Sequence, residues 1–399
     1  MIKFNLVREV RELKNQLSYS KKYGFFFGAG TSCALGVPNI ATLTTEVEGD
    51  LKDDFLSYFR KTKEDLSSTY PEKTINIEDI LNQLRQIRSI TGGKEDKSYL
   101  DISGKSATEL DNEICRKIYG IISASEAMAD LSNTKKFFAW LNMQNRDYSK
   151  EIFTSNYDLI IEKSLEEIRI PYFDGFVGSY EPFFWQESID KFVEKSDLTQ
   201  SWIRLWKIHG SLSWFWKENS EIGSHNIIRV GMISDIKKVD NELVIYPSKE
   251  KYDSSKKQPF VAYFDRFKNV LLNGELLFIF TGYSFSDQHI NEIVFNSLRQ
   301  NNRLCVLVFF YQDAEVEELY KVSSSHLNLT VFGPTKAIIN GTLGAWECNK
   351  EDLKPNEKSD NYWDATNKKM TLGDFNQLIN FLITNSGKKE SIEAIANGK

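Results

Sequence analysis

Residues 23–28 read Y-G-F-F-F-G, a run of aromatic side chains bounded by glycines. An unbroken apolar run of this length is typical of a parallel strand whose two faces are both covered. The strand leads into Gly28-Ala29-Gly30-Thr31-Ser32, where a backbone without side chains can turn sharply and approach a ligand closely. A helix beginning at about Thr31 would direct its free N–H groups into that turn, where they could bind the diphosphate of a nucleotide. The alternative is a tight strand-to-helix turn that binds nothing.

The composition limits the classes of function that the chain can have. Its 399 residues can bury a full core, and a formal net charge of −6 without any strongly basic stretch argues against direct nucleic acid binding. No apolar run approaches the ~20 residues of a membrane helix, and the charged N-terminus has no signal-peptide core. The four cysteines are dispersed and form no C-x-x-C pair, so we expect reduced thiols, no metal site and a cytoplasmic location.

Strands and helices alternate along most of the chain. We expect buried strands at Glu151–Asn156, Trp202–Ile208, Leu276–Thr281 and Arg303–Phe310, with helices following the first and the third. Such alternation predicts an α/β fold with a Rossmann-like, doubly wound parallel sheet.

Two further regions do not follow this alternation. Residues 41–150 read as a large helical insertion, which includes an apolar stripe at helical spacing. The stripe consists of Ile77, Ile80, Leu81, Leu84 and Ile87. Trp214–Pro247 has the turns and alternation of a small antiparallel element. Aromatic residues crowd Tyr172–Trp185 and Trp202–Trp216, where they either stack on a base or nicotinamide ring or pack under a loop.

Four expected strand ends carry glycines and polar residues. These segments are Gly28–Ser32, Thr154–Asp158, Ile208–Ser211 and Thr281–Ser284. Ligands of open parallel sheets bind outside the carboxyl ends of the strands, so we expect the four segments to converge on one crevice. Taken singly, each has an ordinary structural explanation. Asn156 and Asp158 can cap a helix, and His209 can be a hydrogen-bonded structural imidazole.

Together the four segments resemble the signature motifs of the sirtuin fold. G-A-G-T-S (28–32), T-S-N-Y-D (154–158) and K-I-H-G (207–210) are similar to the first three motifs. G-Y-S-F-S-D-Q-H-I (282–290) resembles the ribose-contacting segment of sirtuin-like domains in bacterial antiphage defence proteins. The resemblance covers Tyr23 to Phe310 in motif order. It implies an NAD-binding catalytic domain over residues 1–345, followed by a linker and a C-terminal helix over residues 346–399.

The resemblance also implies a role for each matching residue. Asn156 would contact the nicotinamide ribose or the attacking water, and Asp158 would face the carboxamide of the substrate. His209 would be the catalytic base or a ribose-orienting group. The residues implied to hold the diphosphate of NAD are Gly28, Ala29, Gly30, Thr31 and Ser32, and those implied to hold the adenosine ribose are Gly282, Tyr283 and Ser284.

Two departures from the protein-deacylating sirtuins point away from a protein substrate. After Pro38 the chain continues N-I-A, without the Phe and Arg of the sirtuin pattern, and residues 210–247 lack the two C-x-x-C pairs of the zinc module. The resemblance therefore implies an NAD+ hydrolase that uses water as the acceptor and acts in antiphage defence by NAD depletion. One alternative is a non-catalytic NAD or ADP-ribose sensor. The other is an NAD-dependent protein deacylase or ADP-ribosyl transferase.

The expected C-terminal helix is apolar around most of its circumference. Its apolar residues are Phe375, Leu378, Ile379, Phe381, Leu382 and Ile383, and we expect a capping box at Thr371–Asp374 to begin it. The helix is either buried in its own chain or docked on another subunit, as the linker-like Asn349–Asn361 would permit. The resemblance adds that sirtuin-like defence NADases commonly form homo-oligomers, and that some work with a HerA-like ring ATPase.

Overall fold

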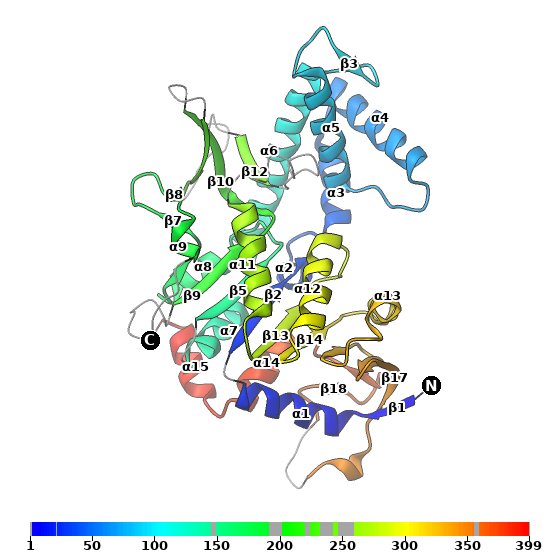
Figure 1. Ribbon diagram of the computed structural model, residues 1–399, viewed down its shortest axis with the longest axis vertical. Coiled ribbons are helices and arrows are strands. Elements are labelled where there is room, and N and C mark those ends of the chain that lie inside the picture. The colour runs from blue at the N-terminus through cyan, green and yellow to red at the C-terminus, as the bar shows by residue number, and fades with distance from the viewer. Residues whose placement is uncertain are drawn as a thin grey trace.

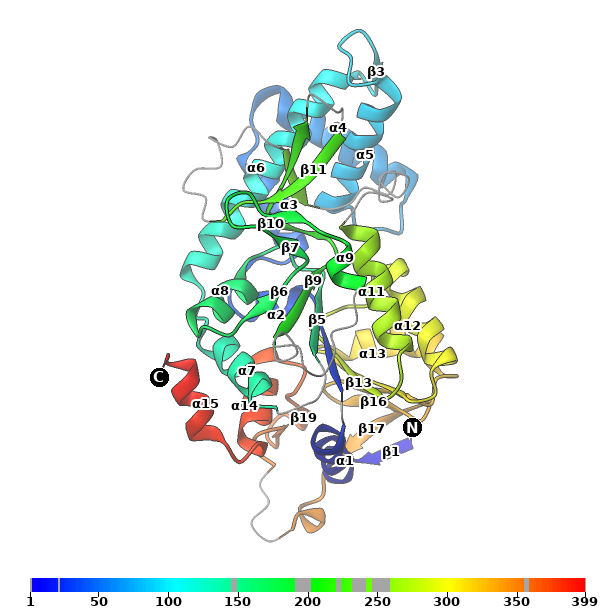
Figure 2. The same ribbon diagram turned by 60° about the vertical axis from the view of Figure 1, so that its left-hand side comes forward.

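The computed structural model describes residues 2–20, 22–144, 149–190, 202–219, 224–231, 242–245, 259–354 and 359–398. Its centre is a sheet that contains ten strands among these residues, with helices on both faces (Figures 1 and 2). In sheet order the strands are β1 (Ile2–Asn5), β17 (Thr342–Glu347), β16 (Lys336–Ile339), β15 (Leu329–Phe332), β14 (Leu304–Phe309), β13 (Leu276–Thr281), β2 (Tyr23–Phe27), β5 (Lys150–Thr154), β9 (Ile203–Lys207) and β6 (Tyr172–Phe173). All neighbouring strands from β15 to β6 are parallel.

The strand order is that of a doubly wound sheet. Across β9-β5-β2-β13-β14-β15, numbering the strands as they occur along the chain gives 3-2-1-4-5-6. The direction of winding reverses between β2 and β13, so the crevice beyond the ends of these two strands is the switch point at which ligands of such sheets bind. The Rossmann-like α/β fold expected from the sequence is confirmed.

Helices on both faces explain why the run in β2 is apolar throughout. The helices are α1 (Leu6–Tyr19), α7 (Ser132–Asn142), α8 (Ile160–Glu167) and α14 (Phe375–Asn385) on one face, and α11 (Phe260–Leu272), α12 (Gln288–Gln300) and α13 (Asp313–Ser323) on the other. The ring of Phe25 lies 5.1 Å from that of Phe137 in α7. The next residue, Phe26, points to the opposite face and lies 5.8 Å from Phe267 in α11. A strand covered on both faces has no side for polar residues.

The helical insertion projects from one end of the sheet (Figure 1). It consists of α3 (Ile40–Asp50), α4 (Asp53–Thr69), α5 (Ile77–Thr91) and α6 (Gly104–Met128), with a short β3–β4 hairpin (Ser98–Tyr99 and Ile102–Ser103). The expected stripe of α5 is fully buried, and Gly92 ends that helix in the left-handed conformation with φ of 62°. The insertion is shorter than the expected residues 41–150. Helix α7 falls within that range, but it packs on the main sheet and is not part of the insertion.

A second, antiparallel sheet lies between the insertion and the main sheet (Figure 2). Its strands are β12 (Glu242–Ile245), β10 (Gly210–Asn219), β11 (Ser224–Arg229), β8 (Phe183–Phe184) and β7 (Phe176–Val177), with α9 (Glu187–Asp190) following β8. The antiparallel element expected at Trp214–Pro247 is confirmed where it is described; residues 220–223, 232–241 and 246–247 lie outside the described residues. Trp206 and Trp214 are buried against Tyr263, so in these two positions the aromatic residues are core.

The chain beyond Phe310 holds more sheet than the sequence pattern indicated. β15 extends the parallel part, and the hairpin of β16 and β17 continues it antiparallel. β17 then pairs in parallel with β1, so the N-terminal segment begins with a strand that precedes α1. Because β17 runs to Glu347, the expected domain boundary after residue 345 falls inside a strand of the main sheet.

The C-terminal helix is buried in its own chain. All six of its apolar residues contribute to the core shared with α7, and α15 (Lys389–Ala396) packs beside them. Asp374 caps the helix by accepting from the N–H of Gln377 at 3.0 Å. The expected start at Thr371 is wrong, because the N–H of Thr371 donates to Tyr362 and continues the β18–β19 hairpin (Trp363–Asp364 and Lys369–Met370). No helix in the described part of the chain is long and apolar enough to cross a membrane.

Candidate active site

The four segments singled out in the sequence all follow strands that are neighbours in the sheet. They are the loops after β2, β5, β9 and β13, and parallel strands place these loops at the same edge. Hydrogen bonds join them into a closed ring. The N–H of Gly30 donates to Gly282 at 2.8 Å, and the N–H of Leu212 donates to Tyr157 at 2.8 Å. Two side chains, those of Asn156 and His209, complete the ring.

Glycines allow the loops after β2 and β13 to touch. A Cβ on Gly28 would lie 2.4 Å from the carbonyl oxygen of Gly282, and one on Gly30 would lie 2.7 Å from its Cα. Gly282 itself has φ of 64°, and a Cβ there would lie 2.4 Å from the nitrogen of Thr31. Three glycines are therefore required by backbone packing alone, before any ligand is considered.

The turn after β2 differs in detail from the expectation. Helix α2 (Ala29–Cys33) begins two residues before Thr31 and is only five residues long. The N–H of Gly30 donates to Gly282, and the N–H of Thr31 donates to Gly28 at 3.0 Å. These two donors are therefore engaged within the chain, while Ala29 and Gly30 are exposed at the tip of the turn.

Asn156 ties the loop after β5 to the loop after β2. Its side-chain nitrogen donates to the carbonyl oxygen of Gly28 at 3.0 Å and lies 3.1 Å from Thr31 Oγ1 and 2.9 Å from Ser32 Oγ. Asn156 is buried, and its own N–H donates to Thr154 Oγ1 at 2.9 Å. Backbone and side chain are both fixed, so the amide is held in one orientation.

Asp158 is also engaged by its own chain. One carboxylate oxygen accepts from Ser32 Oγ at 2.6 Å, and the other accepts from the N–H of Ile160 at 3.2 Å. The Lys207 ammonium donates to the carbonyl oxygen of Asp158 and lies 2.8 Å from Glu162 Oε1. Asp158 is 5% exposed. These contacts assign it a part in holding the first loop in place.

His209 is paired with an aspartate that the sequence reasoning did not single out. Its Nε2 lies 3.0 Å from Oδ2 of Asp287, the residue that caps α12. Burial lowers the pKa of His209, but the hydrogen bond to Asp287, the charge of Asp287 and that of Glu78 outweigh it, so the pKa is raised above its ordinary value. Burial raises the pKa of Asp287, but His209 and two backbone N–H donors outweigh it and hold the pKa below its usual range.

The loop after β13 divides into a buried and an exposed part. The ring of Tyr283 is 5% exposed and packs 4.7 Å from Phe26, and its hydroxyl donates to Asn291 Oδ1 at 3.2 Å. Tyr283 is therefore a core residue. Ser284 is exposed, and its hydroxyl lies 3.0 Å from that of Ser286. Ser284 is therefore better placed than Tyr283 for contact with a ligand.

Within the described residues, no group of three or more histidine, cysteine or carboxylate side chains is arranged to hold a metal ion. Burial raises the pKa of Cys33, and the charge of Asp158 raises it further, which makes this thiol a poor nucleophile at neutral pH.

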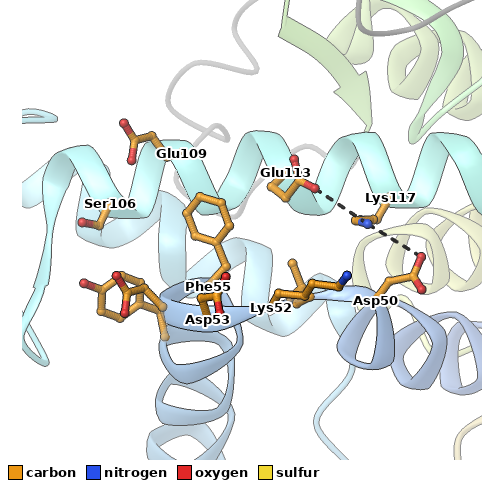
Figure 3. A pocket seen from close by; sticks show the side chains of 11 residues that line it. Asp50, Lys52, Asp53, Phe55, Ser106, Glu109, Glu113 and Lys117 are labelled. Carbon is orange, nitrogen blue, oxygen red and sulfur yellow. Dashed lines mark ion pairs between the residues drawn. The ribbon is translucent and has the colours of Figure 1, made fainter.

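A cavity of about 510 Å³ lies in the helical insertion (Figure 3). It is bounded by the junction of α3 and α4 and by α6, and Lys117 spans it, 3.8 Å from Asp50 and 3.9 Å from Glu113. None of its lining residues comes from the four loops, so this cavity is separate from the candidate site.

Residues 150–328 match the family model of the SIR2-like domain, which is just under half of the chain. The matched segment includes the loops after β5, β9 and β13, and the strand order places the loop after β2 beside them. The chain thus has a sirtuin-like fold built around a SIR2-like domain.

Solved structures similar to the chain include a Sir2 homologue in complex with NAD, at 14% identity over 75% of this chain and 81% of that chain, with a TM-score of 0.40. A Sir2 homologue mutant in complex with ADP-ribose is similar at 14% identity over 75% of this chain and 83% of that chain, with a TM-score of 0.33. Because these TM-scores are low, the assignment of the fold rests on the family model and on the strand order and not on these structures. No curated protein matches the sequence.

Proposed function

We propose that this protein is an NAD+ glycohydrolase, which cleaves the bond between nicotinamide and ribose and transfers the ADP-ribosyl group to water. The observation that carries the proposal is the ring of four hydrogen-bonded loops at the switch point, which presents Asn156 and His209 together. A tight turn that serves packing alone would need the glycines and could use Asn156 to tie its loops together, but it would not need the imidazole of His209 at the same edge of the sheet.

The reaction in this site is balanced without a metal. The glycosidic C–N bond breaks, and its electron pair returns to the nicotinamide ring, which leaves as a neutral molecule. Positive charge develops on the ribose, as in glycoside hydrolysis, until a water oxygen bonds to the same carbon. The proton that this water loses is taken up by His209 and then released to solvent. Asn156 orients the ribose or the attacking water.

The remaining residues of the four loops bind the substrate in this proposal. Residues 28–32 hold the diphosphate, for which the exposed Ala29 and Gly30 offer close backbone approach. Gly282 and Ser284 hold the adenosine ribose, while Tyr283 supports them from the core. Asp158 acts through Ser32 by fixing the loop, and its carboxylate reaches the carboxamide only if it exchanges the Ser32 contact for the substrate.

The biological setting is part of the proposal as well. The resemblance to sirtuin-like antiphage proteins suggests a cytoplasmic effector that depletes NAD, forms homo-oligomers and acts alone or with a HerA-like ATPase. An alternative function is an NAD or ADP-ribose sensor, which is favoured by one observation. Asn156 and Asp158 already have partners in the chain, as they would in a purely structural site.

The test is incubation of the purified protein with NAD, followed by chromatography of nicotinamide and of the ribosyl product. We expect equal amounts of nicotinamide and ADP-ribose, and a loss of turnover of at least ~100-fold in both Asn156→Ala and His209→Ala. Asn133→Ala is the matched control, because this amide in α7 bonds only to Asn376 among the contacts described. Binding of NAD without turnover, under every activating condition tried, would support the sensor instead.

A further inference from the structure

Asp287 holds a position that its role as a helix cap does not fully explain. One carboxylate oxygen, Oδ1, accepts from the N–H groups of His289 at 2.9 Å and Ile290 at 3.2 Å. These two bonds cap α12 and fix the plane of the carboxylate. The second oxygen, Oδ2, has no part in the cap and lies 3.0 Å from Nε2 of His209.

The pair is partly shielded from solvent. The side chains of His209 and Asp287 are 16% and 24% exposed. A charge-assisted hydrogen bond in such surroundings is stronger than one at an open surface. Because backbone N–H groups of α12 hold the carboxylate of Asp287 in place, the carboxylate can fix the orientation of the His209 imidazole.

We propose that Asp287 is the positioning residue for His209, an inference that rests on the proposed function. The carboxylate accepts a hydrogen bond from Nε2–H, which leaves the lone pair on Nδ1 as the site that takes a proton from water or a ribose hydroxyl. When Nδ1 is protonated, the imidazolium is stabilised by the negative charge of Asp287. The aspartate itself stays ionised and does not touch the substrate.

The charges around the ring agree with this assignment. Two carboxylates act on His209: Asp287 at the start of α12, and Glu78 in the first turn of α5. Together they raise the pKa of His209 against the effect of its burial. Glu78 belongs to the helical insertion, so the insertion also contributes to the electrostatics of the site.

Asp287→Asn separates positioning from capping. Asparagine caps helices as well as aspartate does, and the two backbone N–H groups require its oxygen on their side. Its NH2 group therefore faces His209 and donates to Nε2. That reverses the neutral tautomer, moves the proton to Nδ1 and removes the acceptor. Asp287→Ser is the second variant, because serine keeps a capping oxygen but is too short to bridge to the ring.

The first experiment is an NMR titration of the imidazole signals, for which the chain has four histidines. The signal lost in His209→Gln identifies His209. We expect its pKa to fall by about 1–3 units in Asp287→Asn, with the neutral ring switching from the Nε2–H to the Nδ1–H tautomer. An unchanged pKa and tautomer would overturn the proposal. This readout needs no turnover, so it remains decisive if the protein proves not to hydrolyse NAD.

The second experiment measures NAD hydrolysis by the same variants across pH. We expect kcat to fall by ~100-fold or more in Asp287→Asn while KM stays within about threefold, since the lost interaction acts on the base and not on binding. In Asp287→Ser the acid limb of the pH profile should move to lower pH, following the pKa of His209. Asp374→Asn, the same substitution at the cap of α14, is the control and should leave kcat and the pH profile unchanged. An equal loss of kcat in Asp287→Asn and Asp374→Asn would show that Asp287 has only a structural role.

Discussion

The backbone N–H of Gly30 donates to the carbonyl oxygen of Gly282 at 2.8 Å, which joins the loops after β2 and β13 across the switch point. This contact is made by residues more than 250 positions apart in the chain, and it lies between the two strands where the winding of the sheet reverses. The loop proposed to hold the diphosphate and the loop proposed to hold the ribose are thus in direct contact.

Gly282→Ala should destabilise the protein and weaken NAD binding. The new Cβ would lie 2.4 Å from the nitrogen of Thr31 on a backbone with φ of 64°. Strain and overlap together should lower the free energy of unfolding by about 2 kcal/mol or more, measured by urea denaturation. Gly120→Ala is the matched control, because Gly120 lies in α6 with nothing within 4 Å of the added Cβ. This substitution should raise the free energy of unfolding by about 0.5–1 kcal/mol. Equal effects of the two variants would contradict the close packing.

The His209–Asp287 pair should make stability depend on pH. The raised pKa of His209 stabilises the fold below its unfolded value of about 6.5, and this is lost as pH rises through the folded pKa. The lowered pKa of Asp287 stabilises the fold above about 3.9, and this is lost as pH falls through its folded pKa.

The pair therefore contributes most between about pH 4 and 6.5. We expect the free energy of unfolding of the wild type to exceed that of His209→Gln by about 1.5 kcal/mol in that window. The difference should be smaller at pH 9, and thermal unfolding across pH measures it. A difference that does not change with pH would show that the ion pair is not formed in solution.

Phe375→Ala should destabilise the sheet rather than an interface between subunits. The ring lies 5.3 Å from Phe27 in β2 and is 3% exposed, so its removal should lower the free energy of unfolding by about 3–5 kcal/mol. Deletion from Met370 onward should likewise unfold the chain. Leu327→Ala, at a position 68% exposed, is the control and should change stability by less than about 0.5 kcal/mol. A truncated protein that keeps its fold would show that this helix is dispensable.

The purified protein should contain no stoichiometric zinc and should not deacylate peptides. The four cysteines are dispersed along the chain, and the chain lacks the Phe-Arg pair that follows the first loop of the deacylating sirtuins. Elemental analysis of the protein and release of lysine from an acetylated peptide with NAD are the two measurements. A zinc ion in every chain, or NAD-dependent release of lysine, would overturn this prediction.

The hairpin of β16 and β17 was not predicted, although its sequence contains a turn signal. Asn340-Gly341 joins β16 and β17, and both residues have positive φ, of 50° and 70°. An Asn-Gly pair between two apolar runs is the strongest local sign of a hairpin, and it predicts these two strands. β1 offers no such sign, because its four residues become a strand only by pairing with Gly344–Glu347 at the far end of the chain.

Local sequence patterns are enough to predict the parallel sheet and the positions of the four loops. A run such as F-F-F admits few environments besides a strand covered on both faces, and Gly28, Gly30 and Gly282 tolerate contacts that side chains exclude. Which side chains meet at those loops depends on how the chain folds in three dimensions. The pairing of His209 with Asp287, and the nearby charge of Glu78, join β9, α12 and the helical insertion. Such contacts depend on the order of the strands in space, which local sequence patterns do not encode.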